Sequence, residues 1–502
     1  MEVNKDHPIT GTLYQYMNSI TSLLAGALFY VFLTKSQSTT FVGAYVLVTA
    51  VYGLFNSIFS FGLTQAGQHF ISFFIGQKNE GAIKEALKKI LTLTLLLSLL
   101  AALTIELLAG GISIVFFHSP FYLPRIRLVG VLVLFLIPSG ILNGIFLGLQ
   151  KFKLAGILGI TGPLISYSIA LSLLLKFHTL RSIIIGWIIG YFISVLIYGI
   201  FLLRVSSIRP TTGSINYRQI GKYSWPIVLS SVVGFSAMYI DRFVVSIFLD
   251  VSTLGIYNVA LLVATTLPFI ISPIGNVLLP KLSEFFSTSD RGSIKSANRV
   301  SSNFYVFIYV PTALMIASLG QAVILILSKG NYVSASLPMD ILLFVSALFV
   351  IGNSIGQTIY AIKETRILVV SATMALLSNI GLSFLLIPHF GMVGAAVANS
   401  SVTAVSFAVQ FLYIRKKNVL SFDLGFILRT WISSIVVFFF SEMISFVISD
   451  IYLRVALVIV LGYSLYLGLL KMMGGLPEEM KSLLNGYFSS RIKFVSFIIT
   501  HM

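Results

Sequence analysis

Four ionisable side chains lie deep inside long apolar stretches of the sequence: Glu106, Asp241, Arg242 and Glu442. A charge within a membrane helix is costly, so it points to a substrate, ion or proton site by default. Arg242 could anchor an anionic substrate, because a guanidinium matches a phosphate with two parallel hydrogen bonds. Asp241, Glu106 and Glu442 could instead couple to an ion or gate by exchanging partners. The competing interpretation is a structural ion pair that locks helices together.

These four residues are predicted to share one depth. Each lies about 15 to 17 positions from the same end of its apolar run, or about 24 Å along a helix. Adjacent residues point in different directions on a helix, so Asp241 and Arg242 are expected to have separate partners. Glu106 is the candidate partner of Arg242.

Amide side chains recur within the apolar runs, and Asn56, Asn258 and Asn353 are further candidates for substrate binding. Buried amides can bridge helices, and a polar cavity that passes sugars would need the same groups. The residue types alone leave both roles open.

No grouping of residues in the sequence is typical of catalysis or of a cofactor. Cysteine is absent, which excludes disulfides and thiolate metal sites. His69 and His389 are isolated, and no glycine-rich phosphate loop ends in Gly-Lys-Ser/Thr. We therefore expect no enzyme activity, no metal and no cofactor, and any driving force must be an ion gradient, the membrane potential or substrate consumption.

The composition identifies the elements that must position these side chains. Hydrophobic residues make up 57% of the 502 residues and charged residues only 10%, against about 25% charged in a typical soluble domain. Such a chain cannot cover its apolar surface in water, so the lipid bilayer is its expected solvent. The net charge of +17 does not indicate nucleic acid, because the basic residues lie in short loops between apolar runs.

A membrane helix needs about 20 apolar residues, and the sequence contains fourteen such runs. The polar start of the chain lacks a cleavage site, so the first run is expected to be retained. The runs are Leu13–Leu33, Phe41–Phe61, Ile90–Phe116, Leu128–Leu147, Leu154–Leu175, Ile183–Leu203, Trp225–Leu249, Leu254–Leu279, Phe304–Leu327, Ile341–Ile362, Ile367–Ile387, Val393–Ile414, Ile427–Val447 and Tyr452–Leu470.

Lysine and arginine predict the orientation of these runs. With a cytoplasmic N-terminus, 25 of the 33 basic residues fall in inner loops and 8 in outer ones, as the positive-inside rule requires. Both termini are therefore predicted to be cytoplasmic, in a multi-pass protein of the plasma membrane.

The sequence also repeats itself at an offset of 212 residues. Gly43-Ala44-Tyr45 then aligns with Gly255-Ile256-Tyr257, and Gly140 and Gly144 align with Gly352 and Gly356. Six runs lie in each copy, so the copies have the same orientation and are expected to be related by a pseudo-twofold axis along the membrane normal. The predicted fold is all-α: two six-helix bundles, 1–212 and 213–418, two further membrane helices in 419–472, and an amphipathic cytoplasmic tail, 473–502.

Glycine and proline mark expected contacts and bends. Glycines four apart let helices approach closely, so Gly140 with Gly144, and Gly352 with Gly356, are expected to pack helices. A proline removes a backbone donor and kinks its helix. Pro268 and Pro273 together make the run 254–279 the most strongly bent, and such bends serve either as hinges or as fixed shape.

Three segments resemble a known family. They are Tyr239-Ile240-Asp241-Arg242-Phe243, Leu254-Gly255-Ile256-Tyr257-Asn258-Val259-Ala260 and Gly391-Met392-Val393-Gly394-Ala395-Ala396-Val397-Ala398. They are similar to the polysaccharide flippases, which translocate O-antigen and other lipid-linked oligosaccharides. That family belongs with lipid II flippases and multidrug and toxin extrusion antiporters in the multidrug/oligosaccharidyl-lipid/polysaccharide exporter superfamily.

The resemblance implies a function. The substrate would be a glycan on a polyprenyl phosphate or diphosphate, moved from the inner to the outer leaflet by alternating access, with glycan-assembly enzymes as possible partners. The first run departs from the lipid II branch, because it contains no arginine or lysine. A cation-coupled exporter of drugs or metabolites is the alternative function, and a non-transporting scaffold for glycan assembly is a third hypothesis.

Overall fold

The computed structural model describes residues 8–205, 215–272, 274, 282, 285–286, 291–362 and 364–482. Throughout these ranges the chain is almost entirely helical and contains no strand. The all-α fold class is therefore confirmed.

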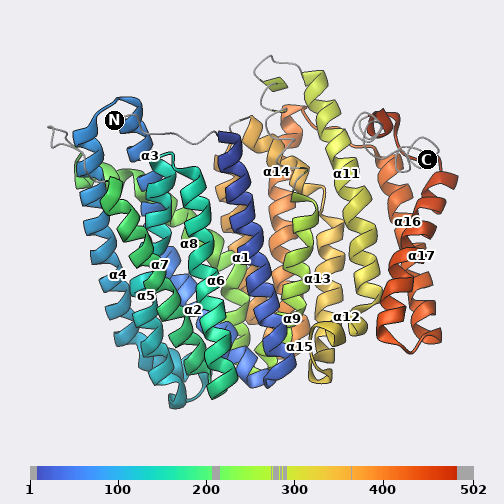
Figure 1. Cartoon of the computed structure of the whole chain (residues 1–502). Helices are drawn as coiled ribbons and strands as arrows, with labels where there is room; N and C mark the ends of the chain where they lie inside the picture. Colours follow the sequence, from blue (N-terminus) through green and yellow to red (C-terminus); the bar gives the residue numbers. More distant parts are fainter. Residues whose placement is uncertain are drawn as a thin grey trace. The chain divides into compact units, whose positions relative to one another are not determined.

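The helices follow one another with short connections and lie alongside one another within each part of the chain (Figure 1). The first group is α1 Pro8–Ser36, α2 Thr39–Phe59, α3 Leu63–Gly76, α4 Glu80–Phe117, η1 Pro120–Tyr122, α5 Leu123–Gly148, α6 Phe152–Phe177, α7 Leu180–Val205 and α8 Tyr217–Phe248. The second is α9 Val251–Thr266, η2 Leu267–Ile270, α11 Arg291–Ser318, α12 Gly320–Leu327, η3 Gly330–Ala335, α13 Ser336–Leu348, α14 Gly352–Ala361, α15 Arg366–Ile414, η4 Arg415–Lys417, α16 Leu424–Val447 and α17 Ile451–Met472.

Helix α4 shows why these elements belong in a bilayer. Its outward face carries Leu99, Leu103 and Leu107, which are 60%, 55% and 75% exposed. Its inward face is lined by small or hydroxylated residues that include Ser98 and Ala101, both buried. Apolar side chains outside and small residues at the contacts are the arrangement of a membrane helix, so this is a multi-pass membrane protein.

Thirteen stretches of the described residues are long and apolar enough to cross a bilayer. One of them, Arg366–Lys417, has 52 residues. A straight helix of that length would span about 78 Å, against a hydrocarbon core of about 30 Å. The predicted count of fourteen membrane helices depends on how this stretch is folded.

Helix α15 folds back on itself at Gly391. This residue has φ 57° and ψ −134°, a conformation that glycine adopts without a steric penalty, and Pro388 lies just before it. The two arms run antiparallel, because the Ser378 and Ser401 hydroxyls are 3.1 Å apart and Gln410 donates to the Ser371 hydroxyl at 3.1 Å. The break corresponds to the predicted boundary between the runs 367–387 and 393–414; the full count of fourteen stays a prediction.

Proline positions agree with the expected bends in part. Helix α9 ends at Thr266, and Pro268 lies in the 3-10 turn η2 that follows. Pro273 lies outside the described residues. Two other predicted runs are each divided into consecutive helices, α11 with α12 and α13 with α14.

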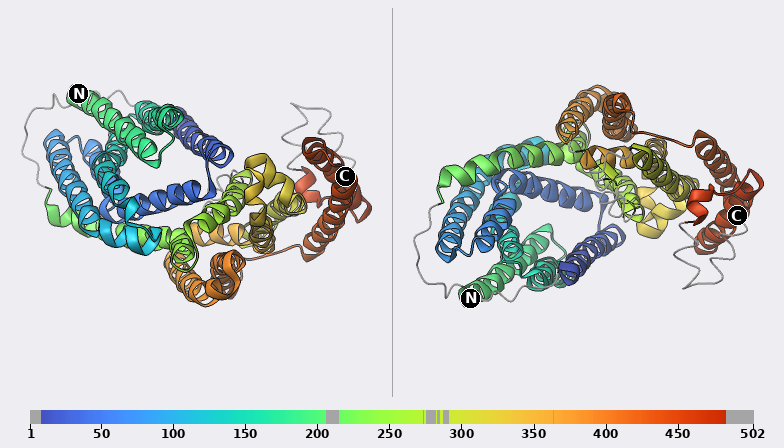
Figure 2. Two further views of the ribbon diagram at one scale, coloured as in Figure 1. Left: turned by 90° about the horizontal axis from the view of Figure 1, so that it is seen from below. Right: turned by 90° about the horizontal axis from the view of Figure 1, so that it is seen from above.

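The chain forms two compact units, unit 1 from Met1 to Gly255 and unit 2 from Ile256 to Met502. In unit 1, α6 packs against α1 and α7, α5 packs against α4 and α3, and α8 packs against α2. The end-on views show these helices of unit 1 side by side (Figure 2). In unit 2, α11 packs against α13 and α16, and α16 packs against α17. The predicted boundary at residue 212 lies outside the described residues, and the boundaries of the predicted bundles stay a proposal.

The first turns of α2 and α9, both within unit 1, make a reciprocal contact. A Cβ on Gly43 would lie 1.6 Å from the Val251 carbonyl oxygen, and one on Gly255 would lie 2.3 Å from that of Thr39. Gly43 and Gly255 are equivalent at the 212-residue offset, as are Thr39 and Val251. The hydroxyls of Thr39 and Ser252 add a hydrogen bond of 2.6 Å. Such reciprocity is expected where duplicated segments meet about a local twofold axis.

Candidate functional site

Asp241 and Arg242 lie on α8, within the interior of unit 1. Their exposed fractions are 0% and 6%. The Arg242 guanidinium folds back along the helix, donates to the Met238 carbonyl at 2.5 Å and lies 4.2 Å from the centre of the Tyr239 ring. Its Nη1 is 3.5 Å from the Asp241 carboxylate. The Arg242 guanidinium therefore contacts both an aromatic ring and a carboxylate in the interior of unit 1.

The expectation of separate partners for these two residues is wrong. Adjacent Cβ atoms diverge on a helix, but the long arginine side chain turns toward the preceding turn, as helical side chains do. That turn brings the guanidinium past Tyr239 to Met238 and within reach of Asp241.

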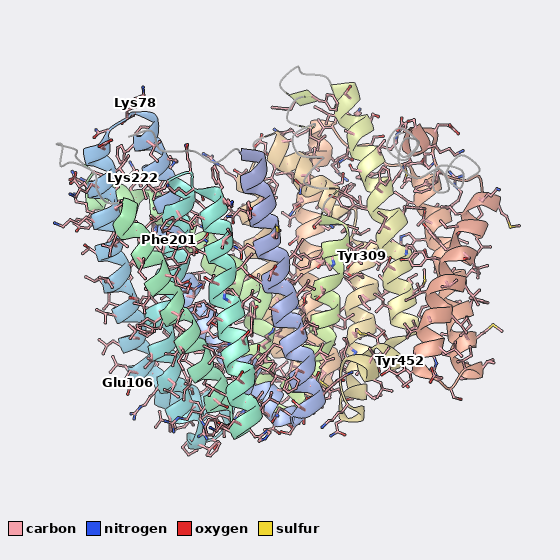
Figure 3. All side chains as sticks on the ribbon, in the orientation of Figure 1. Lys78, Glu106, Phe201, Lys222, Tyr309 and Tyr452 are labelled. Atoms are coloured by element: carbon pink, nitrogen blue, oxygen red, sulfur yellow. The ribbon has the colours of Figure 1, made fainter. Side chains whose placement is uncertain are left out.

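Glu106 pairs with Arg127 rather than with Arg242, which corrects a second expectation. The Glu106 carboxylate is 2.8 Å from the Arg127 Nε, and both side chains are about half exposed at 48% and 55%. Helices α4 and α5 are antiparallel neighbours, so the turn between them brings these residues together. Glu106 lies toward one end of unit 1, and Lys78 and Lys222 lie toward the other (Figure 3).

The three candidate amides are distributed over both units. Asn56 is half-buried on α2 of unit 1, and Asn258 is half-buried on α9 of unit 2. Asn353 is exposed on α14, and its side chain donates to the Val350 carbonyl at 2.9 Å. This bond ties the Asn353 side chain to the backbone just before α14, so it gives Asn353 a structural role as well as the proposed binding role.

The glycines of the two pairs differ in how closely they approach neighbouring helices. A Cβ on Gly144 would lie 2.4 Å from the Thr64 carbonyl oxygen, so α5 approaches α3 closely there. Gly140 has nothing within 4 Å, so the expected packing is not met at that position. Gly352 and Gly356 lie against side chains of α15, those of Phe407 and Gln410.

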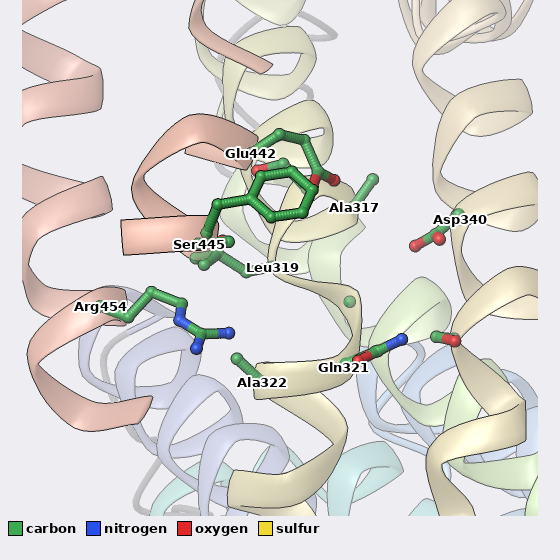
Figure 4. Close-up of a pocket in the computed structure, with 12 residues that line it drawn as sticks. Ala317, Leu319, Gln321, Ala322, Asp340, Glu442, Ser445 and Arg454 are labelled. Atoms are coloured by element: carbon green, nitrogen blue, oxygen red, sulfur yellow. The ribbon is translucent and has the colours of Figure 1, made fainter. Parts of the chain in front are cut away.

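Glu442 lines a polar cavity of about 320 Å³ in unit 2. Glu442 on α16 and Arg454 on α17 lie on one side of α12, and Asp340 on α13 lies on the other (Figure 4). Arg454 donates from Nε to the Ile448 carbonyl at 2.9 Å. Gly320 leaves room for the Asp340 carboxylate, since a Cβ there would lie 3.0 Å from Oδ1.

Two residues of these sites were missed from the sequence. Tyr239 is three positions before Arg242, which is the helical spacing that puts two side chains on one face. Asp340 immediately precedes an apolar run, so it reads as part of a loop until the cavity shows it facing inward. Among the described residues no group of three or more histidine, aspartate and glutamate side chains could hold a metal.

Residues 32–337 match the sequence model of the polysaccharide biosynthesis protein family. The chain is 27% identical over 195 residues to a protein of Haloferax volcanii described as the probable low-salt glycan biosynthesis flippase Agl15. It is 24% identical over 203 residues to the capsular polysaccharide biosynthesis protein CapF of Staphylococcus aureus. These alignments cover 39% and 40% of this chain, and 40% and 50% of the relatives.

Solved structures share the fold. The lipid II flippase MurJ in an inward closed conformation superposes with a TM-score of 0.75 at 17% identity, over 92% of this chain and 98% of that one. An inward-facing multidrug resistance transporter of the MATE family gives 0.68 at 13% identity, over 79% and 94%. Because the family match covers more than half of the sequence, this chain belongs to the polysaccharide biosynthesis protein family.

Proposed function

We propose that this protein is a membrane flippase for a lipid-linked oligosaccharide. It moves a glycan carried on a polyprenyl phosphate or diphosphate from the inner to the outer leaflet by alternating access, without covalent chemistry. The family match and the flippase named among its relatives support this proposal. The structural observation on which the proposal mainly depends is the buried guanidinium of Arg242, within a helix that crosses the apolar core.

The energetics favour this role for Arg242. A glycan head cannot cross hydrocarbon unaided, because each unsatisfied polar group costs several kcal/mol there. The Arg242–Asp241 separation of 3.5 Å exceeds the length of about 2.7 to 2.9 Å of a charge-assisted hydrogen bond. A phosphate can therefore bind the guanidinium while the Asp241 carboxylate stays beside it.

Asn56, Asn258 and Asn353 complete the proposed substrate contacts. Each amide can both donate and accept, which suits the hydroxyls of a sugar. Asn56 lies on α2, a helix that packs against α8 of unit 1. The proposal for Asn258 and Asn353 rests on their residue type and their places within predicted membrane runs.

The outward direction of transport is the one that the family resemblance implies, and the proposed orientation identifies the inner face of the protein. Lys78, which follows α3, and Lys222, near the start of α8, lie toward the same end of unit 1 (Figure 3), which supports the positive-inside assignment. We place that end and both termini in the cytoplasm of a cell whose plasma membrane holds the protein. Glycan-assembly enzymes on the same face would then supply the substrate.

Ion coupling, if the transport uses it, is proposed at Glu442, whose cavity also contains Asp340 and Arg454. This observation also favours the second candidate function, a cation-coupled exporter of drugs or metabolites. Asp241 and Glu106 are less suited, because each already contacts an arginine.

Reconstitution tests the proposal directly. Purified protein in liposomes is expected to expose a labelled lipid-linked glycan to the opposite leaflet faster than protein-free liposomes do. An equal rate in the two preparations contradicts the flippase proposal. Transport of an amphipathic dye that depends on a cation gradient, with no movement of the glycan, would support the exporter instead.

A further inference from the structure

Aromatic side chains of unit 1 form a connected set across several helices. Phe29 on α1 is 5.9 Å from Tyr45 on α2 and 5.2 Å from Tyr167 on α6, measured between ring centres. The side chains of Tyr45 and Tyr167 are neighbours in this set. Trp187 on α7 lies 5.5 Å from Tyr45, so four helices contribute to one aromatic assembly.

Tyr52 extends this assembly toward the charged pair. It is about two turns further along α2 than Tyr45 and meets Trp187 edge-on at 5.5 Å. Tyr167, Tyr191 and Tyr239 also lie near it. Gly53 makes room beside it, since a Cβ there would lie 2.6 Å from the ring of Phe235.

Helix α8 joins the assembly to Arg242. Phe235 and Tyr239 stack at 4.3 Å with an angle of 5° between their rings, and Arg242 lies 4.2 Å from the Tyr239 ring centre. A path of rings therefore leads from Tyr52 to the guanidinium. We call Tyr52, Tyr167, Tyr191 and Tyr239 the tyrosine surface.

The tyrosine surface retains solvent-accessible area although its members converge from four helices. All four tyrosines are half-buried, whereas Tyr45 behind them is buried. Converging side chains that packed against one another completely would all be buried. The four tyrosines therefore keep side-chain area that a ligand can contact.

Three of the four tyrosines lie in the first copy of the repeat and have no aromatic counterpart in the second. At the 212-residue offset, Tyr52, Tyr167 and Tyr191 correspond to Ala264, Asn379 and Thr403. A purely packing role would be expected to need bulk in both copies. The difference indicates that these three tyrosines serve a purpose that their counterparts in the second copy do not share.

The geometry points to the tyrosine surface as the binding site for the glycan, beside Arg242, which binds the phosphate. This inference rests on the proposed function and adds the residues that hold the sugars. A phenol offers an apolar face and a hydroxyl that donates and accepts. A sugar ring offers an apolar C–H face edged by hydroxyls, so the two surfaces match in both respects.

The test compares tyrosine variants with a matched control in the same flipping assay. Tyr52→Phe and Tyr167→Phe keep the rings and remove one hydroxyl each, so each is expected to slow glycan flipping about 3- to 10-fold. Tyr52→Leu also removes the ring and is expected to slow it further. Tyr309→Phe is the control, because Tyr309 is a buried tyrosine of unit 2 that bonds Ser346 at 3.0 Å.

A binding measurement distinguishes sugar from lipid. With Trp225 and Trp431 replaced by phenylalanine, Trp187 is the one remaining tryptophan, and its contacts with Tyr45 and Tyr52 make its fluorescence a local probe. Lipid-linked glycan extracted from the producing cells is expected to change this signal. The polyprenyl phosphate obtained from the same extract by removing the glycan is expected to leave it unchanged.

Two results would overturn the inference. One is wild-type flipping rates in Tyr52→Leu and Tyr167→Phe, in preparations where the wild type flips the glycan. The other is a Trp187 response of equal size to the polyprenyl phosphate without glycan. Failure of the wild type to flip any lipid-linked glycan is a different outcome, because it contradicts the proposed function itself.

Discussion

Replacing Arg242 with lysine separates the charge of this residue from its planar shape. Lysine keeps the positive charge opposite the Asp241 carboxylate, which is fully buried. It loses the two-pronged contact with a phosphate and the stacking of the guanidinium on Tyr239. Arg242→Ala is a poorer test, because a buried carboxylate left without its cation costs about 3 to 5 kcal/mol of folding stability.

The expected magnitude follows from the contacts that are lost. One charge-assisted hydrogen bond contributes about 1.5 to 3 kcal/mol, which corresponds to about 10- to 150-fold in affinity. The stacking on Tyr239 adds about 0.5 to 2 kcal/mol, but it is present with and without substrate and so affects stability more than binding. We therefore expect Arg242→Lys to weaken binding of the lipid-linked glycan about 10-fold or more.

The assay is the initial rate of glycan flipping in proteoliposomes at limiting substrate, with thermal unfolding measured on the same preparation. Arg127→Lys is the matched control, because Arg127 pairs with Glu106 at an exposed position. Exposed ion pairs contribute about 0 to 1 kcal/mol, so its rate is expected to equal that of the wild type. An unchanged flipping rate in folded Arg242→Lys would refute the proposal that the guanidinium binds the phosphate.

Three further predictions concern the fold and the coupling site. Cysteines at Ser378 and Ser401 should form a disulfide under mild oxidation, since the hydroxyls are 3.1 Å apart and the chain has no other cysteine. A straight helix would separate the two by about 35 Å, so absence of the cross-link would contradict the hairpin. Gly144→Ala should lower the unfolding temperature through overpacking of about 1 to 3 kcal/mol. Gly140→Ala should not lower it, because its Cβ meets open space, and equal effects would refute the assigned contacts. Glu442→Gln should reduce the dependence of transport on a proton or sodium gradient and leave exchange without a gradient intact, as measured with imposed gradients; an unchanged dependence would exclude Glu442 from coupling.

The helical class and the places of the helices followed from local properties of the sequence. Apolar runs of the required length are local, and so are the glycine and proline residues that end them. Gly391 shows this well, because a turn between two predicted runs occurs at that residue and its φ of 57° needs a glycine. The two charged residues Asp241 and Arg242 were also visible from the sequence, because a charge inside an apolar run is conspicuous.

The partners of those charges could not be predicted from spacing. The common depth of Glu106 and Arg242 along their helices predicted that they would pair. The partner of Glu106 is instead Arg127, on the neighbouring helix. The angle around the helix and the conformation of a long side chain decide such pairings, and neither is encoded locally. Gly140 and Gly144 make the same point, since only Gly144 faces a backbone.

By itself, the sequence determined that this protein lies in a membrane, that its chain is helical, and which residues carry charge into the apolar region. Those properties depend on the amino-acid composition and on the lengths and spacing of the apolar runs, which are local features of the chain. Only the tertiary structure decided that Arg242 lies on Tyr239, that tyrosines of four helices converge beside it, and that Glu442 shares a cavity with Asp340. Tyrosines are common in such a chain, and their meaning depends on helices distant in sequence packing with particular faces together.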